Sequence, residues 1–140
     1  MKVAAPVRVW ALLTRVRQLR VQRARRELSD AHAGVERAIA ETARQQSAIA
    51  EHAARRRQIL AECSLGKVGA SLWRGALHRH DAGRAALDLS LALARETEGD
   101  ARALVHEALH RLQKETRGLD DARDEVRRLI AARADRDPDD

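Results

Sequence analysis

The 140-residue sequence lacks the residues that build most globular cores and interrupt most helices. It contains no Phe, no Tyr, two Trp, one Cys and two Pro, and the prolines stand near its ends, at positions 6 and 138. Large aromatic side chains normally supply much of a globular core, and a proline inside a helix kinks or breaks it. These absences argue against a compact globule and leave 131 consecutive residues free of proline.

The single cysteine, Cys63, cannot form a disulfide within the chain, which favours a reducing compartment. Its place beside a predicted loop indicates a small buried side chain and not a nucleophile. The apolar stretch 7–13 contains Arg8, is too short to span a membrane and lacks a signal-peptide cleavage site. We therefore expect a cytoplasmic protein that does not insert into a membrane.

The residues that are present are typical of long helices, since Ala, Leu, Glu and Arg are abundant and 34% of the chain is charged. We expect one all-α domain over residues 1–134, an antiparallel coiled-coil hairpin of two long helices, about 7–63 and about 71–133. Gly66 suits a left-handed helix stop and Ser71 suits an N-cap, so the loop is expected at 64–70. Residues 135–140 are expected to form a disordered acidic tail.

Heptad repeats predict the faces along which the two helices pack. In the first helix the a positions are Val21, Leu28, Val35, Thr42 and Ile49, and the d positions are Ala24, Ala31, Ala38, Gln45 and Ile59. In the second helix the a positions are Leu91, Glu98, Val105, Leu112, Leu119 and Val126, and the d positions are Leu87, Ala94, Ala101, Ala108, Glu115, Ala122 and Leu129. Pairing residues whose numbers add to 136 sets large side chains against small ones in most layers and centres the register on residue 68, inside the predicted loop. This agreement predicts a hairpin within one chain.

The net charge of +6 is concentrated at the N-terminus, where residues 1–26 carry eight basic side chains and no acid. In the predicted register these basic residues face the acidic cluster 120–125, with which we expect them to pair. N-terminal to Val21 the apolar stripe shifts phase to Leu12, Leu13, Val16 and Leu19, which indicates either a stutter or a face for another partner. A basic helix can bind nucleic acid or an acidic protein, but no aromatic residues are interleaved for base stacking.

One motif suggests chemistry, because His106 to His110 match the H-E-x-x-H pattern of zinc peptidases. Ala108 between them belongs to the predicted packing face, so both histidines should point to solvent without a third ligand. We therefore expect no catalytic residue, no metal site and no cofactor. His78 and His80 are expected to be surface groups.

An apolar spot, Leu72, Trp73 and Leu77, follows the predicted loop. Trp73 either packs the loop against the first helix or anchors a partner protein, because exposed Trp is a frequent binding hot spot.

The layout as a whole resembles the FliJ/YscO-type stalk proteins of flagellar and type III secretion export machines. The shared features are a first helix of more than fifty residues, a short Ser/Gly-containing turn, a Trp just after it, a second long helix and a charged tail. The best local match is the segment 64–73.

The resemblance implies a non-catalytic central stalk that bridges a hexameric export ATPase and the cytoplasmic domain of the export gate, at the cytoplasmic face of the inner membrane. Some members also bind secretion chaperones. For this sequence the implied ATPase-binding residues are Arg15, Arg17, Arg20 and Arg23, and the implied gate-binding residues are Leu72, Trp73 and Leu77. A generic structural coiled coil and a basic coiled coil that binds nucleic acid are the alternatives.

Overall fold

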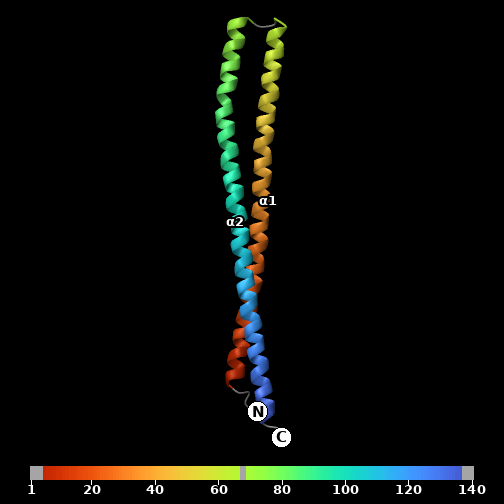
Figure 1. Ribbon diagram of the computed structural model, residues 1–140, viewed down its shortest axis with the longest axis vertical. Coiled ribbons are helices and arrows are strands. Elements are labelled where there is room, and N and C mark those ends of the chain that lie inside the picture. The colour runs from red at the N-terminus through yellow and green to blue at the C-terminus, as the bar shows by residue number, and fades with distance from the viewer. Residues whose placement is uncertain (1–4, 67–68, 137–140) are drawn as a thin grey trace. The chain divides into compact units, whose positions relative to one another are not determined.

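The computed structural model describes residues 5–66 and 69–136. These residues form two helices, α1 (Ala5–Ser64) and α2 (Ala70–Arg136), and no strand. The helices pack against each other and run in opposite directions (Figure 1). The predicted all-α helical hairpin is confirmed.

Both helices are longer than the sequence indicates. α1 begins at Ala5, so Pro6 lies in its first turn, where a missing N–H leaves no helical hydrogen bond unmade. α2 continues through Asp135 to Arg136, and we expected both of these residues in a disordered tail. The positive charges of Arg133 and Arg136 in the last turn interact favourably with the helix dipole and support this extension. The rest of the expected tail, 137–140, lies outside the described residues.

Backbone hydrogen bonds near the turn mark the end of α1 and the start of α2. Gly66 has a φ of 72°, and its N–H donates to the carbonyl oxygen of Cys63 at 3.1 Å, as the predicted left-handed stop requires. The predicted N-cap, Ser71, is wrong, because Ser71 lies inside the first turn of α2. Gly69 takes this place, and its carbonyl oxygen accepts the N–H of Trp73 at 3.1 Å.

The chain divides into two compact units, each of which contains a segment of both helices. We name Met1–His32 with Ala103–Asp140 the terminal unit, and Ala33–Arg102 the turn unit. In each unit the core is a single row of side chains between α1 and α2, which we call the seam.

The buried residues are ones that the heptads place in the seam. They are Val21, Ala24, Ala108, Leu119 and Ala122 in the terminal unit, and Ala38, Thr42 and Ala94 in the turn unit. Alanine predominates because two helices that touch along one narrow face can cover a methyl group, whereas part of a longer side chain extends past the contact.

Contacts between the helices agree with the predicted register inside each unit. In the terminal unit Arg111 donates to Glu27 at 2.6 Å, and in the turn unit Arg56 donates to Asp81 at 2.9 Å. The residue numbers of each pair add to a value close to 136.

The acidic cluster 120–125 pairs differently from our expectation. Asp124 lies 3.4 Å from Arg127, and Glu125 lies 2.6 Å from Arg128, so both acids pair within α2. Residues three apart on one helix are within easy side-chain reach, and α2 carries its own arginines there. Among the described residues, no ion pair joins this cluster to α1.

Candidate protein-binding surfaces

The N-terminal part of α1 presents two faces. The seam face continues in phase towards the N-terminus, since Trp10, Thr14 and Arg17 are half-buried at heptad spacing from Val21. A second face is apolar and exposed, with exposed fractions of 62% for Val9, 68% for Leu12, 43% for Val16 and 52% for Leu19. We call these four residues the outer strip. The phase shift in the sequence therefore marks an additional face and not a stutter.

The four arginines expected to bind an ATPase do not share one face. Arg17 turns into the seam, where its guanidinium lies over Gly118 and occupies the space that a Cβ would take. Its Nε atom is buried and has no hydrogen-bond partner among the described residues. A glycine on α2 is therefore what allows a charged side chain at this seam position.

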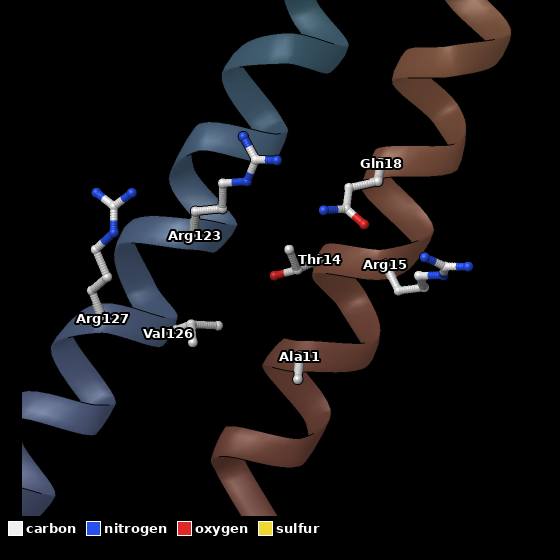
Figure 2. Close-up of a pocket in the computed structure, with 7 residues that line it drawn as sticks. All are labelled: Ala11, Thr14, Arg15, Gln18, Arg123, Val126 and Arg127. Atoms are coloured by element: carbon white, nitrogen blue, oxygen red, sulfur yellow. The ribbon is translucent and has the colours of Figure 1, made fainter.

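Arg15 lies at the edge of a depression between α1 and α2 (Figure 2). Thr14 and Gln18 of α1 point across it towards α2, while the guanidinium of Arg15 points away from α2. The lining residues are Ala11, Thr14, Arg15, Gln18, Arg123, Val126 and Arg127, which include three arginines and no acid. Arg127 pairs with Asp124, whereas Arg15 and Arg123 form no ion pair among the described residues, so the depression retains a basic character.

Arg20 and Arg23 line a second depression, which contains acids. Glu27 of this depression accepts a hydrogen bond from Arg111 and lies 3.3 Å from the Nε atom of Arg23. The hydrogen bond from Arg111 is the main cause that lowers the pKa of Glu27. Arg23 is thus partly neutralised within the chain, in contrast to the basic surface around Arg15.

The residues expected to bind an export gate are also divided. Leu72 is 68% exposed, whereas Trp73 and Leu77, one helical turn apart, are half-buried. The guanidinium carbon of Arg74 lies 5.9 Å from the centre of the Trp73 ring, within the range of a cation–π interaction. Trp73 is therefore partly covered and partly available to a partner.

The turn unit contains a histidine pair that the sequence analysis missed. The rings of His52 and His80 stack with centroids 3.7 Å apart and planes inclined by 13°. Each Nε2 atom lies 2.8 Å from the backbone carbonyl oxygen of the other histidine. A carbonyl oxygen only accepts, so each Nε2 carries a proton. His80 is half-buried in this pair and is not the surface group that we expected.

An ion pair lies beside the two histidines. Arg56 Nε donates to Asp81 at 2.9 Å, and this hydrogen bond is the main cause that lowers the pKa of Asp81 and raises that of Arg56. The histidine pair and the ion pair both join α1 to α2. They add polar contacts between the two helices to the apolar contacts of the seam in the turn unit.

The H-E-x-x-H match lies on an outer face of α2. His106 and His110 are both exposed, and Ala108 between them is buried in the seam. Within residues 5–66 and 69–136, no group of three His, Cys, Asp or Glu residues is placed to hold a metal ion. Cys63 is half-buried, and burial raises the pKa of its thiol.

No protein-family model, curated protein or solved structure matches this chain. Neither helix is long and apolar enough, over its described residues, to cross a membrane. Two surfaces outside the seam therefore remain as candidate binding surfaces, the outer strip in the terminal unit and the Leu72–Trp73–Leu77 spot in the turn unit.

Proposed function

We propose that this protein is a non-catalytic coiled-coil adaptor that binds different proteins through its two units. More specifically, we propose that it is the stalk of a type III secretion or flagellar export apparatus and lies in the cytoplasm at the inner membrane. The terminal unit would bind the hexameric export ATPase, the turn unit would bind the cytoplasmic domain of the export gate, and secretion chaperones would be additional partners.

The observation that carries the proposal is that each unit exposes apolar residues which the hairpin does not need. The outer strip exposes Leu12 by 68%, and the start of α2 exposes Leu72 by the same fraction beside the partly covered Trp73. Single exposed leucines are ordinary, but grouped aliphatics and a Trp are characteristic of protein-binding surfaces. A coiled coil with a purely structural role requires neither group.

The two surfaces also differ in residue type, which favours two partners over one, because the outer strip consists of aliphatic residues and the turn-unit surface contains Trp73. The outer strip lies in a segment without acids, and Arg15 nearby belongs to a basic depression. The turn-unit surface has Arg74 beside Trp73, and further along α2 Asp81 is already paired with Arg56. The terminal unit therefore suits an acidic partner, and the turn unit suits a partner that accepts an aromatic anchor.

The test measures binding of the full chain to a purified export ATPase and to the cytoplasmic domain of a gate protein. We expect Trp73→Ala to weaken gate binding by about 2 kcal/mol, the loss of a partly buried aromatic anchor, and to leave ATPase binding unchanged. We expect Arg15→Glu with Arg20→Glu to abolish ATPase binding and to leave gate binding unchanged. The matched control for charge is Arg55→Glu with Arg79→Glu, which makes the same charge change in the turn unit.

Circular dichroism of each variant must first show that the hairpin is folded. If the folded variants bind both proteins as the parent does, or if the parent binds neither, the export proposal is wrong. A parent that binds neither protein but binds duplex DNA with a strong dependence on salt would favour the basic nucleic-acid-binding alternative. A parent that only self-associates would favour the generic structural coiled coil.

A further inference from the structure

The outer strip has the spacing of a coiled-coil seam. Val9, Leu12, Val16 and Leu19 follow one another at alternating intervals of three and four residues, so Val9 and Val16 take a positions and Leu12 and Leu19 take d positions. Valine at a with leucine at d favours pairing with one further helix. All four side chains are between 43% and 68% exposed.

The outer strip lies on the side of α1 that faces away from α2. The seam has its own a positions at Val7, Thr14 and Val21, so the two sets of a positions are offset by two residues, or roughly 200° around the helix. Trp10 and Thr14 are half-buried on the seam face, which agrees with this offset. α1 is thus a helix with two packing faces, and α2 covers one of them.

The edges of the outer strip are basic. In its heptad, Arg8 and Arg15 take g positions and Arg20 takes an e position, the positions whose charges select the partner of a coiled coil. The guanidinium of Arg15 points away from α2 (Figure 2). Among the described residues, none of these three arginines forms an ion pair, and α1 has no acid before Glu27.

We propose that the outer strip is a docking site for an amphipathic helix of another protein, with aliphatic residues at a and d and with Glu or Asp at e and g. The strip would supply the apolar contact, and Arg8, Arg15 and Arg20 would select the acidic partner. This inference goes beyond the proposed function, because it defines the partner by its chemistry and holds for any acidic helix, whether or not an export ATPase is involved.

Two other occupants fit the observations less well. A second copy of the chain, paired in parallel through the same strip, would place Arg15 of one copy against Arg20 of the other, and this like-charge contact would oppose the pairing. A membrane surface suits a helix with a wide apolar face and aromatic residues. The outer strip is narrow, and the nearest aromatic residue, Trp10, faces the seam.

The test uses two labelled synthetic peptides of about three heptads with Val at a and Leu at d. The acidic peptide has Glu at every e and g position, and the basic peptide has Lys there, so repulsion keeps each from pairing with itself. Fluorescence anisotropy with the full chain should show that the acidic peptide binds at least tenfold more tightly than the basic one.

Two sets of variants assign the binding to the outer strip. Leu12→Gln with Leu19→Gln should weaken binding of the acidic peptide at least tenfold, whereas Leu89→Gln with Leu93→Gln, at matched exposure of 61% and 55%, should not change it. Reversing Arg8, Arg15 and Arg20 to Glu should invert the preference, so that the basic peptide now binds more tightly. The same reversal at Arg55, Arg57 and Arg79 is the control and should not invert it.

Several results would overturn the proposal. Equal binding of the two peptides would overturn it, and so would binding of neither. Unchanged binding of the acidic peptide to folded Leu12→Gln/Leu19→Gln protein would overturn it as well. Binding to phosphatidylglycerol vesicles that depends on Leu12 and Leu19, without peptide binding, would assign the strip to a membrane surface. Sedimentation showing a dimer that these two substitutions dissociate would assign it to a second copy.

Discussion

The packing of large residues against small ones in the seam can be tested by exchanging their sizes across one layer. In the predicted register, Leu28 of α1 faces Ala108 of α2, and the nearby contact of Glu27 with Arg111 supports this pairing within the terminal unit. Ala108 is 6% exposed and Leu28 is half-buried. The perturbation consists of Leu28→Ala, Ala108→Leu and the two combined.

The structure sets the expected size of each effect. Leu28→Ala removes three methylene-sized groups, each contributing about 0.8 kcal/mol when fully buried, so a half-buried Leu28 should lose about 1.2 kcal/mol of unfolding free energy. Ala108→Leu inserts the same groups into a covered site and should cost about 2 kcal/mol through overpacking. In the double variant the new leucine occupies the space that Leu28 leaves. The double variant should therefore lose only about 1 kcal/mol, which corresponds to a coupling of about 2 kcal/mol.

Urea unfolding followed by circular dichroism at 222 nm gives the four free energies of this cycle. The matched control replaces Ala108→Leu with Ala94→Leu, at a seam alanine of nearly equal exposure, 7%. Ala94 lies roughly four helical turns from Ala108 along α2, so it cannot share neighbours with Leu28. Its cycle should be additive within about 0.5 kcal/mol.

The register is refuted if the Leu28 and Ala108 substitutions are as additive as the control pair. A coupling of about 2 kcal/mol in the control cycle, but not in the first, would show that the helices pair in a different register. Equal urea slopes for all variants are required, because a changed slope would mean that the surface exposed on unfolding has changed.

Three further predictions concern single groups. The hydrogen bond from Arg56 lowers the pKa of Asp81 below 3.8, so the contribution of Asp81 to stability is present above pH 3.8 and is lost as the pH falls through the lowered pKa. The urea midpoints of Asp81→Asn and the parent should therefore differ at pH 7 and converge once the pH is below that lowered pKa, and a constant difference would contradict this. Because His106 and His110 are exposed, replacing both with Gln should leave the unfolding free energy within about 0.5 kcal/mol, and zinc that stays bound at one per chain after dialysis would contradict this. Since burial raises the pKa of Cys63, its thiol should react with iodoacetamide at pH 8 more slowly than free cysteine does, and an equal rate would contradict this.

The heptad pattern predicted the packing face well, because side-chain position around a helix depends only on residue spacing. Val21 and Ala122 are buried where the heptads place them, and the exposed Leu12 belongs to a different phase of the same helix. The left-handed residue at Gly66 was predictable for a similar reason, since glycine alone adopts that conformation without strain.

Interactions that depend on side-chain direction were not predictable from spacing. His52 and His80 do not face each other in the predicted register, and they meet because each imidazole reaches along the seam to the other's backbone carbonyl. Arg17 carries a charge at a seam position, which only the missing side chain of Gly118 makes possible. The pairing of Asp124 with Arg127 likewise depended on which of several arginines lay within reach.

The amino-acid sequence by itself determined the two helices, the turn between them and the residues of the seam. Heptad spacing without proline, and the glycines at positions 66 and 69, act through local backbone geometry. The tertiary structure alone decided which side chains remain available for binding. The sequence grouped Arg15, Arg17, Arg20 and Arg23 as one basic set, but packing turned Arg17 into the seam and placed Arg111 of α2 against Glu27, the neighbour of Arg23. It also left Val9, Leu12, Val16 and Leu19 exposed on the face of α1 opposite α2. Because α2 occupies one face of α1, the outer strip on the other face remains exposed to a further helix.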